Sequence, residues 1–256
     1  MITNTPAPLP ADLEAGLRRL RLATIRRQAP EILLTAKTQR WTPEETLRVL
    51  VEMEVVARDE SNMRSRMKAA RFPVEKTLDE FHLDESSIPR ASHDYLTTLD
   101  WIRRADNLCL IGPPGTGKTH YLIALGRAAV EAGHRVRYYT AIELVETLWR
   151  AQADNTVGKT IEAICRNDLI CIDEIGFAPL EPVLSQLLFR LISTAYEKRS
   201  LGIASHTPFE DWGRFIPDQP TAVAILDRLC HHAHIITTSG DSWRLTHRTT
   251  GGDILN

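Results

Sequence analysis

Apolar residues recur at helical spacing near the amino end of the chain. From Asp12 onward, Leu13, Leu17 and Leu20 lie three or four residues apart, with arginines between and after them. Positions three or four apart share one face of a helix, so this segment is predicted to be an amphipathic basic helix. Pro30 cannot donate the backbone hydrogen bond that a continuing helix needs, and we expect the helix to break or restart there.

A second helix is predicted to begin at Thr42-Pro43-Glu44-Glu45. A threonine can cap the first turn, a proline fits the first helical position, and a glutamate three residues after the cap completes the pattern. The helix is expected to continue to about Arg71.

The helical region is followed by a segment without a clear period. Residues 73–92 contain Pro73, Pro89 and mixed charges, which is typical of a linker. We therefore expect a helical N-terminal domain, residues 1–72, and a larger domain, residues 93–256.

Beyond residue 92, apolar runs of strand length alternate with helical stretches. The runs are Leu108–Ile111, Val136–Tyr139, Leu169–Ile172, Leu201–Ala204 and Ile235–Thr237. This alternation is typical of a parallel sheet with helices on both faces. The expected fold class is therefore α/β, with a parallel sheet flanked by helices and preceded by a small all-helical domain.

Composition excludes several classes of protein. With 43% hydrophobic and 25% charged residues, the chain differs from disordered and fibrous proteins. It has no apolar run near the roughly 18 residues of a membrane span, and Met1–Pro10 lacks the order of a signal peptide. We therefore expect a cytoplasmic protein without membrane contact. The four cysteines have no paired spacing and are expected to be reduced and mostly buried: Cys109, Cys165, Cys171 and Cys230.

A phosphate-binding loop is predicted between the first apolar run and the helical stretch that starts at Thr119. Its residues fit the pattern G-x-x-x-x-G-K-[ST] and are Gly112, Pro113, Pro114, Gly115, Thr116, Gly117, Lys118 and Thr119. Glycines let such a loop wrap so tightly that backbone N–H groups point at phosphate oxygens. Lys118 is expected to contact the β- and γ-phosphates of ATP, and the Thr119 hydroxyl to ligate Mg²⁺. A glycine-rich turn is the alternative, and the strand and helix on either side argue against it.

The third apolar run ends in an acidic pair, Asp173-Glu174. Charges at the end of a buried strand need a partner, and the pattern is that of a Walker B site. Asp173 is expected to hold Mg²⁺ through its water shell, and Glu174 to polarise the water that attacks the γ-phosphate. The pair predicts hydrolysis of ATP in addition to binding. An acidic pair that caps a helix is the alternative.

Two further residues are candidates for completing the site. His206 follows the fourth apolar run, where related ATPases carry a polar residue near the γ-phosphate; a hydrogen-bonded loop histidine is the alternative. Arg228 ends an apolar helical run and is a candidate arginine finger for the nucleotide of a neighbouring subunit in a ring. An ion pair with Asp227 or another acid is the alternative for Arg228.

The segment after Arg228 contains one cysteine and three histidines within residues 230–234. Consecutive ligands strain the tetrahedral geometry of zinc, and no distant second pair accompanies them. A helix-to-strand junction is therefore favoured over a zinc site.

The chain has a formal charge of −2, but its charges are unevenly distributed. Residues 1–72 contain thirteen Lys and Arg against nine Asp and Glu, a local balance of +4. Arg64, Lys68 and Arg71 are spaced to lie on one face of the second predicted helix, which suits contacts with DNA phosphates. Such contacts give affinity with little base specificity. An ordinary solvated face is the alternative, because acidic residues lie just upstream.

Five segments together form a pattern that covers nearly the whole chain. They are Ala70–Leu78, Gly112–His120, Leu169–Gly176, Ser205–Trp212 and Ala224–His234. The pattern resembles the IstB-like helper ATPases of insertion-sequence transposons, relatives of DnaC-type helicase loaders. The chain departs from it at Ser205-His206-Thr207, where the family usually has Ser-Asn-Leu. Imidazole still donates a hydrogen bond but is larger and titratable.

This resemblance implies an initiator-type AAA+ ATPase core behind the helical domain, and it adds His120 to the nucleotide-binding residues. It also implies an ATP-dependent homo-oligomer, assembled through the ATPase domain, that binds duplex DNA. The assembly would help a transposase through target selection or activation. Three alternatives remain: a DnaC-type loader of a replicative helicase, a non-hydrolysing DNA-binding scaffold, and a small-molecule kinase.

Overall fold

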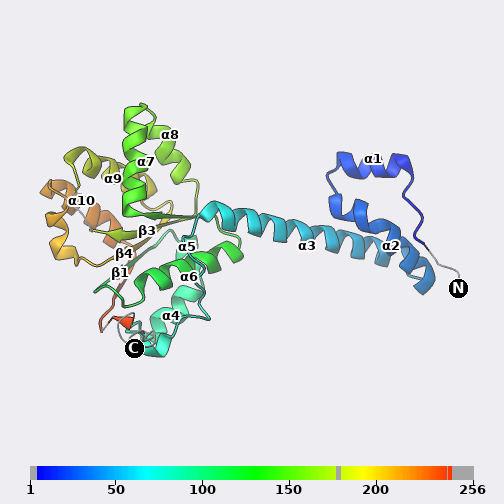
Figure 1. Cartoon of the computed structure of the whole chain (residues 1–256), viewed down its shortest axis with the longest axis horizontal. Coiled ribbons are helices and arrows are strands. Elements are labelled where there is room, and N and C mark those ends of the chain that lie inside the picture. The colour runs from blue at the N-terminus through cyan, green and yellow to red at the C-terminus, as the bar shows by residue number, and fades with distance from the viewer. Residues whose placement is uncertain (1–4, 177–179, 241, 244–256) are drawn as a thin grey trace, which may run out of the picture. The chain divides into compact units, whose positions relative to one another are not determined.

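The computed structural model describes residues 5–176, 180–240 and 242–243 of the 256-residue chain. The chain forms two compact units, which divide between Ser65 and Arg66 (Figure 1). No helix of the described residues combines the length and the apolarity that a membrane span requires.

The helices are α1 (Ala11–Arg19), α2 (Ala23–Gln39), α3 (Pro43–Ala70), α4 (Arg90–Thr97), α5 (Asp100–Arg103), α6 (Lys118–Glu131), α7 (Ala141–Ala153), α8 (Val157–Ile164), α9 (Pro182–Ala195) and α10 (Gln219–Cys230), with 3₁₀ turns η1 (Leu83–Glu85) and η2 (Phe209–Arg214). The strands are β1 (Asn107–Ile111), β2 (Val136–Thr140), β3 (Leu169–Ile175), β4 (Ser200–Ser205) and β5 (Ala233–Thr237).

The first helical run breaks at Arg21 and not at Pro30. Arg21 has a left-handed backbone with φ 56°. The N–H groups of Arg21 and Leu22 donate to the carbonyls of Arg18 and Leu17 at 3.0 and 2.9 Å, which forms a Schellman motif that ends α1. Pro30 lies inside α2, so the break expected there is wrong. Packing of α2 offsets the single hydrogen bond that the proline removes.

A buried carboxylate joins α2 to α3 within the N-terminal unit. Glu54 is 5% exposed and accepts from the backbone N–H groups of Thr24 and Ile25, at 2.8 and 3.0 Å, in the first turn of α2. Its other oxygen pairs with Arg58 at 3.0 Å. Burial would raise the pKa of Glu54, but the backbone and arginine donors outweigh it and hold the pKa below its ordinary value.

The start of α3 confirms the predicted capping pattern. The Thr42 hydroxyl accepts from the N–H of Glu45 at 3.2 Å, and the Glu45 carboxylate accepts from the N–H of Thr42 at 2.7 Å. The helix ends at Ala70, and Arg71 follows with φ 58°.

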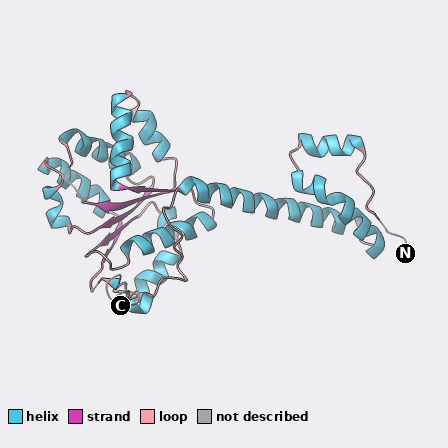
Figure 2. Cartoon of the chain, viewed as in Figure 1, coloured by secondary structure: helices cyan, strands magenta, loops and turns pink. Residues whose placement is uncertain are grey.

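The second unit is built on a five-stranded sheet in which all neighbouring strands are parallel (Figure 2). The strand order is β2-β3-β4-β1-β5. Each of the five predicted apolar runs lies within a strand, and the α/β fold class is confirmed. Because carboxyl ends of parallel strands meet at one edge, the segments that follow β1, β3 and β4 share that edge.

The sheet separates two apolar cores. Tyr138 and Cys171 face the core shared with α4, α5 and α6, whereas Tyr139 and Ile172 face the core shared with α7 to α10. Consecutive side chains of a strand point to opposite faces, which explains this division. Helices α6 and α7 accordingly lie on opposite sides of the sheet (Figure 1).

Residues 73–92, which we expected as a linker, lie in the second unit. Leu78, Phe81 and Leu83 pack against the core on the α6 face, and Ile88 is buried in it. Apolar residues at irregular intervals can fill a core without the regular period of a helix or strand, so the sequence pattern did not reveal this packing.

Glu54→Ala is expected to loosen the first turn of α2, because two N–H groups lose their acceptor at a buried position. A loss of about 2 kcal/mol would speed amide hydrogen exchange at Thr24 and Ile25 roughly 30-fold. The exposed Glu52→Ala is the matched control and should leave both amides unchanged. Equal exchange in the two variants would show that Glu54 does not support α2.

Candidate functional site

The predicted phosphate loop connects β1 to α6, and α6 begins at Lys118. Gly112, Gly115 and Gly117 all have positive φ angles, at 151°, 85° and 87°. A side chain at Gly112 would collide with Thr238, and one at Gly115 would collide with Ser242. Glycine is therefore required by both backbone conformation and close approach, and the loop has the backbone form that phosphate binding needs.

The two reactive side chains of the loop lie at the start of α6. The Lys118 ammonium is nearly buried and donates to the Pro113 carbonyl at 2.6 Å, which holds it within the loop. Thr119, the next residue of α6, is partly buried. A helix amino terminus carries partial positive charge and unpaired N–H groups, so this arrangement favours an anion such as a phosphate.

Thr238, which follows β5, braces the loop from the side. Its N–H donates to the Ile111 carbonyl at 2.6 Å, and its hydroxyl shares a hydrogen bond with the Thr116 hydroxyl at 2.7 Å. The Trp243 N–H donates to the Gly115 carbonyl at 3.1 Å. Sequence reasoning missed this brace because Thr116 and Thr238 are 122 residues apart and no local motif joins them.

The His120 ring contacts residues 77–81, which precede the sheet in the sequence. Its Nε2 lies 3.1 Å from the Thr77 carbonyl, and its ring meets the ring of Phe81 edge-on, with centroids 5.3 Å apart. Burial is the main cause that lowers the pKa of His120, so the ring is neutral near pH 7. The Phe81 ring also lies against Gly117, so residues 77–81 border the phosphate loop.

Asp173 lies near the end of β3 and is 3% exposed. One oxygen accepts from the N–H of Glu174 at 2.9 Å, and the other accepts from the Tyr138 hydroxyl at 2.7 Å. Burial and the neighbouring Asp173 charge raise the pKa of Tyr138, so this hydroxyl stays a donor. A carboxylate offers about four lone-pair sites, and two therefore remain for the waters of a cation.

Glu174 projects from an irregularity in β3. The pairing of β3 with β4 shifts register between Ile172 and Ile175, and Glu174 between them has φ 61°. Its neighbours Asp173 and Ile175 are buried, whereas Glu174 is exposed. A bulge of this kind re-aims one side chain, and here it turns a carboxylate out of the sheet beside Asp173.

His206 lies at the same edge of the sheet as the phosphate loop. Ser205, the last residue of β4, accepts from the N–H of Gly112 at 3.1 Å through its carbonyl. The Ser205 hydroxyl lies 2.9 Å from the carbonyl oxygens of both Ile175 in β3 and Thr207, and its single proton is available to either of them. His206 follows directly and is exposed. Residues 112–119, the acidic pair and His206 therefore lie at the same edge of the sheet.

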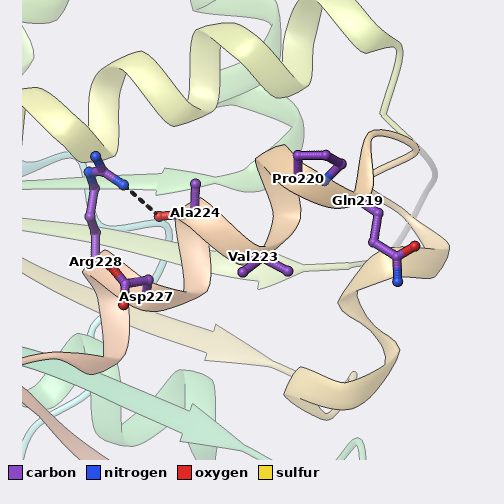
Figure 3. Close-up of a pocket in the computed structure, with 6 residues that line it drawn as sticks. All are labelled: Gln219, Pro220, Val223, Ala224, Asp227 and Arg228. Atoms are coloured by element: carbon purple, nitrogen blue, oxygen red, sulfur yellow. Dashed lines mark hydrogen bonds between the residues drawn. The ribbon is translucent and has the colours of Figure 1, made fainter.

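Arg228 lies in the last turn of α10 and faces α9 (Figure 3). Its guanidinium donates to the Ala224 carbonyl at 3.0 Å and lies over the ring of Phe189, 4.9 Å from the ring centroid. The described part of the chain holds no ion pair of Arg228. With Asp227 and Val223 it lines an open surface pocket of about 710 Å³.

Arg228 lies far from the phosphate loop of its own chain. The carbonyl of the next residue, Leu229, accepts from the Asn107 side chain at 3.0 Å, and Asn107 begins β1. The phosphate loop follows the opposite end of β1, and a five-residue strand spans about 13 Å. Arg228 is therefore at the amino edge of the sheet, whereas the loop is at the carboxyl edge.

At the helix-to-strand junction after Arg228, the ring centroids of His231 and His232 lie 4.1 Å apart, and His232 Nε2 lies 3.7 Å from the Glu197 carboxylate, whereas His234 has a different partner. His231 Nδ1 lies 2.8 Å from the Tyr196 hydroxyl, and His234 Nε2 lies 3.7 Å from the Asp106 carboxylate. His232 lies at the junction between α10 and β5, and its carbonyl accepts from the N–H of Asn107.

The DNA-contact candidates do not form the row that their spacing predicted. Arg64 and Lys68 are exposed on α3, and Arg64 pairs with Glu60 at 3.6 Å. Arg71 lies one residue beyond the end of α3 in a left-handed conformation. The expectation of three cations on one helix face is therefore wrong for Arg71, because the helix ends before it.

Comparison with known protein sequences identifies one family. The profile of the family described as IstB-like ATP binding protein matches residues 15–251. The chain is 36% identical over 242 residues to an ATP-binding protein of insertion sequence IS21 from Pseudomonas aeruginosa, covering 94% of this chain and 91% of that protein. It is 33% identical over 211 residues to an ATP-binding protein of insertion sequence IS5376 from Geobacillus stearothermophilus, covering 82% of this chain and 84% of that protein.

Solved structures agree with this result in fold. The structure of DnaI gives a TM-score of 0.54 at 15% identity, covering 64% of this chain and 92% of that chain. The structure of AMPPCP-bound DnaA from Aquifex aeolicus gives a TM-score of 0.50 at 20% identity, covering 64% of this chain and 50% of that chain. At these identities the similarity concerns the fold alone, and it agrees with the parallel sheet flanked by helices.

Thr238→Val is expected to weaken ATP binding roughly fivefold, because the phosphate loop loses one hydrogen bond worth about 1 kcal/mol. Thr237→Val is the matched control, since Thr237 is adjacent and exposed. Equilibrium titration with a fluorescent ATP analogue measures both variants. Equal affinities would show that the Thr238 brace does not order the loop.

Proposed function

This chain belongs to the family of IstB-like ATP-binding proteins, and on that premise we propose that it assembles on duplex DNA and helps a transposase. The chain is an ATPase with an AAA+ core. The observation that carries the proposal is the division of the site between two edges of the sheet. The phosphate loop, Asp173 and Glu174 lie at the carboxyl edge, and Arg228 lies at the amino edge. In the proposed assembly, each subunit would supply Arg228 to the nucleotide site of its neighbour.

ATP would bind with its phosphates in the loop of residues 112–119. The positive φ glycines let the loop wrap tightly enough for its N–H groups to turn toward the phosphates, and Lys118 would exchange its bond with Pro113 for the β- and γ-phosphates. Thr119 and Asp173 supply oxygen donors of the kind that Mg²⁺ prefers, and they would hold it. When bound, Mg²⁺ would neutralise charge on the phosphates.

Glu174 is the residue we assign to catalysis of hydrolysis. Its exposed carboxylate leaves the strand at the bulge, where it would orient and polarise the attacking water. His206, at the end of the next strand, would donate a hydrogen bond toward the γ-phosphate or that water. Its imidazole would take the role that the family usually gives to an asparagine amide.

Arg228 would act on the nucleotide of a neighbouring subunit. Its present partners are a backbone carbonyl and an aromatic ring, Ala224 and Phe189, so a stronger anionic partner can replace them. A guanidinium beside the γ-phosphate stabilises the charge that develops during transfer. Turnover would therefore depend on assembly of a homo-oligomer through the ATPase domains.

The DNA and transposase roles rest on the family and on the charge of the amino end. The relatives are ATP-binding proteins of insertion sequences, and mobile elements of that kind need a transposase. Residues 1–72 have a local charge balance of +4, which suits phosphate contacts by the two exposed cations of α3, Arg64 and Lys68. We propose that ATP switches the assembly between states that hold and release DNA.

Arg228→Ala and Lys118→Ala are each expected to lose most ATP turnover when assayed alone. Mixed in equal amounts, the two variants should regain about a quarter of the wild-type rate, because some junctions then pair an intact loop with an intact arginine. Arg214→Ala is the control, since Arg214 is exposed and pairs with Asp211, and it should keep full turnover. A mixture as inactive as its components would contradict action in trans.

The overall function is tested by measuring ATP turnover and particle size together, with and without duplex DNA. ATP and DNA together should produce a larger particle. Glu174→Gln should keep that particle while turnover falls roughly 100-fold, because the base is lost but the nucleotide stays bound. The exposed Glu162→Gln is the control and should behave as wild type.

If the protein remained monomeric in the presence of ATP and DNA, the proposed assembly would be wrong. If the chain captured a replicative helicase stably and had no effect on transposase activity, its function would be helicase loading and the proposed role in transposition would be wrong.

A further inference from the structure

Two neighbouring residues of β2 contact the end of α3 and the segment that follows it. The Arg137 guanidinium donates to the Ala69 carbonyl at 2.9 Å, and Ala70 is fully buried. Residues 69–72 therefore belong to the packed part of the second unit. β2 is the edge strand of the sheet next to β3, which carries the acidic pair.

Phe72 is the packing partner of the second of these residues, Tyr138. The two ring centroids are 6.1 Å apart and the rings are inclined by 58°. Phe72 also presses on α6 at Gly126, where an added Cβ would lie 2.9 Å from the Phe72 ring. Gly126 thus allows the ring to sit between α6 and β2, and the position of Phe72 limits the position of the Tyr138 ring.

The far end of Tyr138 reaches the acidic pair. The ring is 4% exposed, and its hydroxyl donates to the Asp173 carboxylate at 2.7 Å. A carboxylate without this donor would be free to rotate about its terminal bond, since the N–H of Glu174 holds only the other oxygen. The aromatic ring is rigid, so it transmits the position of its packed face to its hydroxyl.

We infer that Tyr138 is a positioning residue for the carboxylate of Asp173 and that Phe72 makes this positioning depend on the segment at the end of α3. The inference rests on the proposed role of Asp173 in holding Mg²⁺. It assigns residues outside the sequence motifs to the site. It also gives a physical route by which the region after the N-terminal unit bears on nucleotide binding.

The test measures how Mg²⁺ strengthens binding of a fluorescent ATP analogue by the full chain. Tyr138→Phe removes only the hydroxyl and keeps the ring. It should raise the Mg²⁺ concentration for the half-maximal effect roughly tenfold, because a charge-assisted hydrogen bond orients the carboxylate. Binding in EDTA should stay unchanged. Tyr139→Phe is the matched control, since the adjacent ring faces the other core, and its Mg²⁺ curve should match wild type.

Phe72→Leu tests the second half of the inference. It keeps the Tyr138 hydroxyl and loosens the ring, so it should shift the Mg²⁺ curve in the same direction by a smaller factor. Amide hydrogen exchange gives an independent measurement. Mg²⁺ and ATP should slow the exchange of residues 69–72 in wild type, and Tyr138→Phe should abolish this added protection.

Three outcomes separate the possible failures. If Asp173→Asn leaves the Mg²⁺ curve unchanged, the proposed role of Asp173 is wrong. If Asp173→Asn shifts the curve but Tyr138→Phe matches Tyr139→Phe, Tyr138 does not position the carboxylate. If Tyr138→Phe shifts the curve while Phe72→Leu and the exchange of residues 69–72 show no change, the dependence on the end of α3 is wrong.

Discussion

The parallel register of the sheet is the constraint on which the rest of the site depends. Ser205 at the end of β4 pairs with Ile111 on one side and with Ile175 on the other. These pairings set the ends of three strands at one edge, although they come from distant parts of the sequence. A shift of one residue would turn every side chain to the wrong face and separate the acidic pair from the phosphate loop.

The parts of the fold that the sequence predicts are those with local causes. A phosphate loop needs glycines at fixed spacing, and a capped helix start needs Thr42 and Glu45 three residues apart. Buried parallel strands show continuous apolar runs, so their number and approximate ends could be predicted. The sequence also placed Asp173 and Glu174 at the end of an apolar run, and the structure includes both in the last part of β3. All these signals lie within a few residues of the position they describe.

The contacts that sequence could not predict join residues far apart in the chain. Tyr138 and Asp173 are 35 residues apart, and Thr116 and Thr238 are 122 apart. No spacing rule connects such pairs, because only the folded sheet brings them together. Pro30 failed as a helix signal for a related reason: the packing of a whole helix outweighs one missing hydrogen bond. The motifs of the site can therefore be found in short stretches of sequence, whereas the hydrogen bonds that hold these motifs in place come from distant residues.

The left-handed backbone of Glu174 lowers the stability of the fold at a residue whose carboxylate is proposed to serve catalysis. A residue with a Cβ loses about 1–2 kcal/mol in that conformation, and glycine does not. At φ 61°, selection for thermal stability alone would favour glycine or asparagine at this position and discard the carboxylate. A directed-evolution experiment on this protein would therefore need turnover as a separate criterion, because its most stable variants would be expected to include inactive ones.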